Sequence, residues 1–131
     1  MTATSHRQGE GGQASVELAL TLPVVALLLL AVLQVALLGR DYVLVTHATR
    51  AAAREAAVDR RPASVRHAAL IAAPTLKAAR VSTETSYRRG SPGIVNVRLQ
   101  YRSPTDVPLV GPLLPDVVLS GNAAIRDESD T

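Results

Sequence analysis

The chain has 131 residues, of which 47% are hydrophobic and none is cysteine, and its formal net charge is +3. This length admits one small domain and one membrane segment, and the lack of cysteine excludes disulfide bonds and thiolate metal sites. Aromatic residues make up only 2% of the chain and the arginines are scattered, so no base-stacking or strongly basic nucleic-acid surface is expected.

The first twelve residues, MTATSHRQGEGG, are polar and glycine-rich, which predicts a disordered leader. They lack the basic start of a secretory signal peptide, and the apolar segment that follows has no small-residue cleavage site at its far end. We therefore expect that apolar segment to be retained as a membrane anchor.

The anchor is an apolar run, Leu18–Leu38, which is long enough to cross a hydrocarbon core of about 30 Å as one helix. Glu17 stands at its leading edge, where a carboxylate is unfavourable and therefore a functional candidate. Gln34 lies inside the run, and we expect it to face another helix rather than lipid. Gly39 and Arg40 mark the expected membrane exit.

A proline interrupts the backbone hydrogen bonding of this helix. Pro23 has no N–H to donate, and its ring crowds the carbonyl of Ala19. It is either an ordinary membrane proline, tolerated because neighbouring groups compensate, or a weak point at which the helix bends or unwinds.

Residues 41–60 contain neither proline nor glycine and are rich in alanine, so the helix is expected to continue as a stalk from Gln13 to Arg60. Ala48, Ala52 and Ala56 recur every fourth residue, which either forms a seam for close approach of another helix or reflects helix propensity alone. We expect Pro62 to end this helix and Ser64 to cap a short second one.

The rest of the chain predicts three strands. Apolar and polar residues alternate over 81–87 and 95–101, and Val117, Leu119, Ala123 and Ile125 indicate a third strand. The connection 103–116 holds four prolines and many apolar residues, so it either packs over the sheet or forms a partner surface.

These elements predict an α+β fold: a long N-terminal transmembrane and stalk helix, a short helix, and a small antiparallel sheet of about three strands. The expected organisation is a leader (1–12), a transmembrane helix (13–39), a helical stalk (40–61) and a small α+β domain (62–131).

Motifs typical of enzymes are missing from the sequence. It has no G-x-S-x-G, no phosphate-binding glycine loop and no H-E-x-x-H. The three histidines, His6, His47 and His67, lie far apart without the spacing of metal ligands. We therefore expect no catalytic residue, no metal, no cofactor and no small-molecule substrate.

The order glycine, four residues, glutamate and apolar helix resembles the class III signal of type IV pilins and pseudopilins. The wider pattern G-x-A-S-V-E-L-A-L-x-L-P, read from Gly12 to Pro23, is similar to the TadE-like pseudopilins of the tight-adherence (Flp) pilus system. The resemblance is strongest over 12–54. Leu18 follows the glutamate where the main pilins of this system usually carry tyrosine, which favours the pseudopilin branch.

The resemblance implies that prepilin peptidase cleaves between Gly12 and Gln13, so that Glu17 becomes the fifth residue of the mature protein. The new α-amino group would be largely protonated at neutral pH. It could pair with Glu17 of the same or a neighbouring chain and fix the register of a helical assembly.

The expected function is that of a minor pilin or pseudopilin, with other pilins, the inner-membrane assembly platform and the lipid bilayer as partners. The alternative is an uncleaved single-pass scaffold of a secretion complex. The resemblance places the leader in the cytoplasm, the anchor in the inner membrane, and the domain outside, alone or in a surface pilus. The arginines at 50, 54, 60 and 61 favour the opposite orientation by the positive-inside rule.

Overall fold

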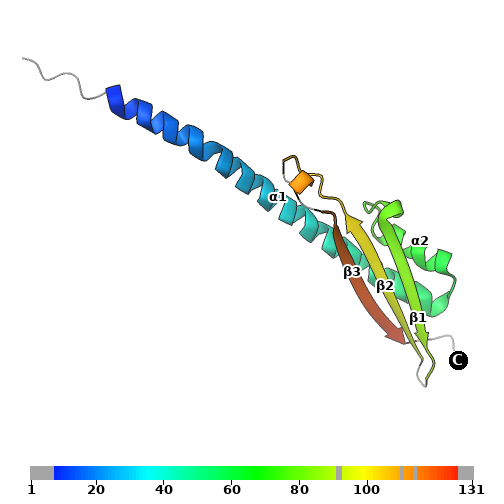
Figure 1. The fold of residues 1–131 in the computed structure, drawn as a ribbon. Helices are drawn as coiled ribbons and strands as arrows, with labels where there is room; N and C mark the ends of the chain where they lie inside the picture. Colours follow the sequence, from blue (N-terminus) through cyan, green and yellow to red (C-terminus); the bar gives the residue numbers. More distant parts are fainter. Residues whose placement is uncertain (1–7, 91–92, 110, 114, 127–131) are drawn as a thin grey trace, which may run out of the picture.

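The structure, a computed structural model, describes residues 8–90, 93–109, 111–113 and 115–126. Its elements in chain order are α1 (Gln8–Val58), α2 (Pro62–Ala72), η1 (Ala78–Arg80), β1 (Val81–Arg88), β2 (Ile94–Ser103), η2 (Gly111–Leu113) and β3 (Val117–Arg126). Figure 1 shows a long α1 whose N-terminal half projects beyond a small helix-and-sheet domain. The predicted α+β fold is confirmed.

The three strands form an antiparallel sheet in the order β1-β2-β3. Val97 at the centre of β2 pairs with Thr85 on one side and Ala123 on the other. Along β2, Val95, Val97 and Leu99 are fully buried, while the residues between them are exposed or partly exposed. The alternation read from the sequence therefore assigns the two faces of the sheet correctly.

The C-terminal half of α1 packs on the inner face of this sheet beside α2, and it forms much of the core. Val45, Ala48, Ala52 and Ala56 recur at helical spacing and have no exposed surface. The structure thus differs from the expected free stalk. Alanines bring the helix backbone close to the sheet, and the apolar face of a three-stranded sheet needs such a cover.

The helix ends also differ from expectation. Residues 8–12 are helical instead of disordered, because a long helix extends at little cost into an adjoining segment once it is nucleated. Pro62 begins α2 rather than merely ending α1, since its missing N–H needs no partner in the first helical turn. Arg61 takes the N-cap position, so the cap expected at Ser64 is wrong.

One glycine allows β3 to lie close against α1. A β-carbon at Gly121 would collide with the Thr49 hydroxyl oxygen and would press on the Thr49 β-carbon and on Val45. The Thr49 hydroxyl itself is buried and donates a 2.7 Å hydrogen bond to the Val45 carbonyl. A residue without a side chain is therefore needed where the strand crosses the helix.

The corner between α1 and α2 is held by a charged pair. The Arg61 guanidinium contacts both carboxylate oxygens of Asp59, with Nη2–Oδ2 at 2.8 Å and Nε–Oδ1 at 3.1 Å. These hydrogen bonds, together with one to Ser64, hold the pKa of the Asp59 carboxyl well below its ordinary range. Nearby, the Tyr87 hydroxyl donates to the Arg60 carbonyl, which ties β1 to the same corner.

Candidate processing and assembly site

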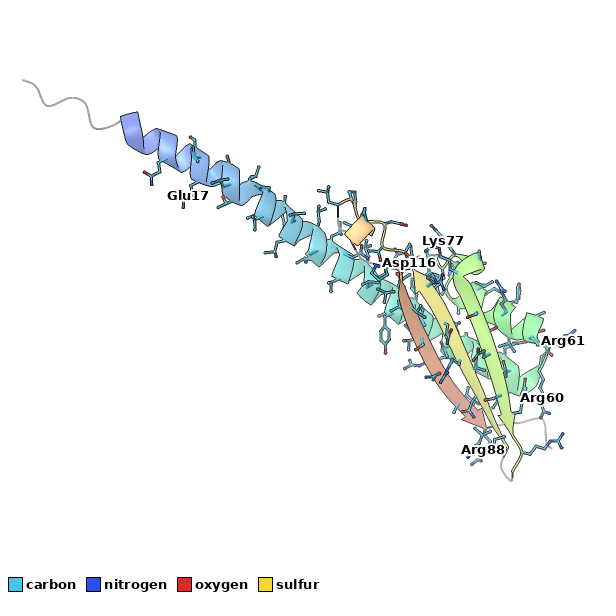
Figure 2. All side chains as sticks on the ribbon, viewed as in Figure 1. Glu17, Arg60, Arg61, Lys77, Arg88 and Asp116 are labelled. Carbon is cyan, nitrogen blue, oxygen red and sulfur yellow. The ribbon has the colours of Figure 1, made fainter. Side chains whose placement is uncertain are left out.

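The residues of the predicted processing motif lie near the N-terminus of α1, far from the domain. Gly12, Gln13 and Glu17 are all helical and exposed. Figure 2 shows Glu17 on the projecting half of the helix, pointing away from it. Nothing lies within 4 Å of the position where a β-carbon at Gly12 would be, so the motif is open to an approaching partner.

Glu17 makes no hydrogen bond or ion pair with the residues that the structure describes. Its neighbours Val16, Leu18 and Leu20 are exposed apolar side chains. If this surface is covered by lipid or by another helix, a carboxylate on it is poorly solvated and needs an opposite charge. The described part of the chain does not supply that charge.

The projecting half of α1 is apolar on every side. From Gly12 to Leu33 all residues are exposed except Leu30, which is partly buried. Within the described residues, α1 is the one helix long and apolar enough to cross a membrane. A helix that is apolar all round is buried in a larger assembly or in a bilayer. This helix therefore indicates a single-pass membrane protein.

Pro23 lies inside this segment without breaking it, since α1 runs continuously from Gln8 to Val58. Two residues earlier, the Thr21 hydroxyl donates a 3.2 Å hydrogen bond to the Leu18 carbonyl. The proline still leaves the Ala19 carbonyl without its usual helical donor. Its role as a weak point remains a prediction.

One face of α1 carries a stripe that the domain covers. Gln34, Asp41, Val45, Ala48 and Ala52 follow one another at steps of three, four or seven residues, and all five are buried or partly buried. The alanines of the predicted seam, Ala48, Ala52 and Ala56, thus face this chain's own domain. A further helix would have to displace that domain to reach them.

Gln34 lies at the membrane end of the stripe. Its side chain is 3% exposed, whereas Leu33 and Val35 on either side are 49% and 68% exposed. Both side-chain polar atoms of Gln34 are buried without a hydrogen-bond partner among the described residues. The sequence predicted that Gln34 faces another helix rather than lipid, and the structure buries it within its own chain.

The connection from β2 to β3, residues 104–116, begins beside this end of the stripe. The Ser103 hydroxyl donates a 2.6 Å hydrogen bond to Asp41 Oδ2, two helical turns from Gln34. From there the connection reaches back along α1 toward its N-terminus (Figure 1). Because the rest of the domain lies on the other side of Asp41 in Figure 1, we infer that the described part of this connection covers Gln34.

The connection is polar at its base and apolar at its tip. At the base, the Thr105 hydroxyl donates to the Pro115 carbonyl at 3.1 Å, and Arg80 pairs with Asp116 at 3.3 Å. At the tip, Leu109 is 66% exposed and has φ of 67°. This left-handed backbone is unfavourable by about 1–2 kcal/mol for a residue with a side chain.

Two open hollows lie on the surface of the described domain. One, of about 490 Å³, lies between α1 and β3 and is lined by Tyr42, Arg50 and the 120–125 stretch. Another, of about 660 Å³, lies on the outer face of the sheet around Arg98, which donates to Asn122. Among the described residues, no group of three or more histidines or carboxylates is arranged to hold a metal ion.

Two structural features were not predicted from the sequence, the Ser103–Asp41 hydrogen bond and the close approach at Gly121. The contact of Ser103 with Asp41 joins positions 62 residues apart, and no local pattern encodes it. Gly121 had a signal that was not used: an isolated glycine inside a strand pattern often marks close approach of another backbone.

Comparison with known proteins bears on the helix alone. No curated protein and no solved structure matches the chain. A family model described as TadE-like protein matches residues 12–54, from the motif glycine to the alanine-rich part of α1. TadE-like proteins are pilus-associated and in general structural rather than enzymatic. The comparison therefore confirms the predicted TadE-like resemblance over residues 12–54 of this chain.

Proposed function

We propose that this protein is a minor pilin or pseudopilin of a tight-adherence pilus system, processed by prepilin peptidase between Gly12 and Gln13. The observation that carries the proposal is the order of features on α1. An accessible Gly12 precedes an exposed Glu17, and an all-round apolar helix follows, all within the TadE-like segment.

The geometry supports assembly through α1. Glu17 has no partner among the described residues, and processing would create an α-amino group four residues before it. In an assembly the two charges would offset each other's desolvation and fix the register between subunits. The apolar surface of the helix would then exchange lipid for neighbouring helices.

The experiment uses substitutions for which the structure provides matched controls. Gly12→Val should leave the full-length precursor in the membrane, because the peptidase recognises the glycine. Gly39→Val is the control, since Gly39 lies in the same helix and also has open space around it. Intact mass is measured in a strain that expresses the cognate peptidase. Normal trimming of the Gly12→Val protein would rule out the processing signal.

Glu17→Gln separates processing from assembly in the same strain. We expect it to be cleaved and inserted, but to fail to support piliation, because breaking a buried charge pair costs about 3–5 kcal/mol. Glu55→Gln, farther along α1, should behave as wild type. Shear recovery of pili gives the readout. Wild-type piliation by Glu17→Gln would show that Glu17 has no assembly role, and an unprocessed wild-type chain would favour the static scaffold.

A further inference from the structure

We propose that the apolar tip of the β2–β3 connection, formed by Pro108–Leu109 and Gly111–Pro112, inserts into the outer interface of the bilayer as a second membrane contact. This inference rests on α1 spanning a membrane, as in the proposed function, and does not depend on cleavage or on pilus assembly.

The connection lies at the level of the bilayer surface. Residues 13–33 of α1 extend about 30 Å at a rise of 1.5 Å per residue, which matches the hydrocarbon core. Gln34, the first residue after them, then lies at the outer interface. If the membrane exit is instead at Gly39, as the sequence suggests, Gln34 lies about 8 Å below the exit. The connection that covers Gln34 meets the bilayer in either case.

The sequence of the connection is apolar. Residues 107–115 read VPLVGPLLP and contain no charged or hydrogen-bonding side chain. Leu109 is 66% exposed, in the same backbone conformation that is unfavourable for a leucine. The described part of the domain leaves most of the Leu109 side chain uncovered. Contact with an apolar environment outside the domain would favour this exposed leucine. The lipid around α1 is the apolar environment next to the connection.

The polar backbone groups of the connection also bear on its entry into lipid. Polar backbone groups must be satisfied before a loop can enter lipid. Pro108 and Pro112 have no N–H, and the Gly111 N–H donates to the Val107 carbonyl at 2.7 Å. The charged groups nearest in sequence, Asp106 and Asp116, flank the tip on the side of the base. The connection thus has the amphipathic form of an interfacial element.

The test uses the fact that the chain has no tryptophan. Single-tryptophan variants of the full chain are placed in phosphatidylcholine vesicles with or without brominated acyl chains, which quench tryptophan on contact. Leu109→Trp reports on the tip. Ile71→Trp on α2 is the matched control, because Ile71 is also 66% exposed. Leu27→Trp, on the projecting half of α1, reports on insertion of the helix itself.

We expect brominated lipid to remove a large part of the emission of Leu109→Trp and Leu27→Trp, and to leave Ile71→Trp unchanged. Quenching at Leu27 without quenching at Leu109 overturns the inference and leaves the anchor standing. A blue-shifted but unquenched Leu109→Trp also overturns it, since protein would then cover the tip. If neither Leu27→Trp nor Leu109→Trp is quenched, both the membrane anchor and the insertion of the tip are overturned. Because Leu109 is exposed, the substitution leaves the packing intact, and Leu109→Cys with a polarity-sensitive label provides an independent reading.

Discussion

At the scale of single residues, the glycines of this chain differ in how much space surrounds them. Gly12 and Gly39 have open space around them on α1, so their lack of a side chain is not required by packing. Gly121 is required by packing, because Thr49 and Val45 occupy the space that a β-carbon would need. The same residue type is thus required by close packing at Gly121 and not at Gly12 or Gly39.

We predict that Gly121→Ala destabilises the domain by about 1–3 kcal/mol, the usual effect of overpacking a core. Gly39→Ala should instead stabilise α1 by about 0.5–1 kcal/mol, because alanine loses less backbone entropy in a helix. Hydrogen exchange of the β3 and α1 amides in the full-length protein measures both effects. Thr49→Ala should partly rescue Gly121→Ala. Unchanged protection of β3 in Gly121→Ala would contradict the close contact.

At the scale of elements, the two halves of α1 have different surroundings. Its N-terminal half is exposed and apolar all round, while its C-terminal half presents an alanine face to the sheet. The second half is fixed at its end by the Asp59–Arg61 pair and near its start by the hydrogen bond between Asp41 and Ser103. The domain is therefore attached to the membrane helix along a continuous face and not through a linker.

The Asp59–Arg61 corner gives a pH-dependent prediction. Because the folded-state pKa of Asp59 is lowered, chiefly by hydrogen bonding to Arg61, its stabilisation is present above the ordinary aspartate value of about 4 and is lost as pH falls below it. Asp59→Asn should lower the denaturation midpoint at neutral pH, and the difference from wild type should shrink in acid.

The midpoint is followed by the near-ultraviolet circular dichroism of the tyrosines, since Tyr87 lies at this corner. Asp106→Asn is the control, because Asp106 is an exposed aspartate without an ion-pair partner among the described residues. A pH-independent difference between wild type and Asp59→Asn would show that the charge of Asp59 does not stabilise the corner.

At the scale of the whole molecule, the fold resolves how so small a domain is stabilised. The sheet has three strands, and its inner face is covered by α2 and by the continuation of the membrane helix. Removing α1 would take away the residues Val45, Ala48, Ala52 and Ala56 from the core. We therefore regard the C-terminal half of α1 and the domain as one folding unit.

The orientation of the whole molecule in the membrane can be tested. We expect the domain to face outward, despite the arginines that follow the span. A reporter enzyme that is active only outside the cytoplasm, fused after Thr131, should be active. A fluorescent reporter that folds only in the cytoplasm, fused at the same place, should be dark. The reverse pattern would invert the topology and remove the pilin proposal.

The sequence by itself determined the element types, the three strands and the TadE-like segment. The length of an apolar run, the alanine content and strict alternation are local patterns. Each one specifies the secondary structure of the segment in which it occurs. The sequence also singled out Glu17, Gln34 and the apolar connection before any contact was known.

Only the tertiary structure decided what those residues face. The alanine seam meets the chain's own sheet, Gln34 is buried within its own chain, and Asp41 binds Ser103 across 62 residues. The end of α1 at Val58 and the start of α2 at Pro62 likewise follow from a corner closed by Arg61 and Asp59. Such contacts depend on how distant segments pack, and no periodicity within one segment specifies its partner.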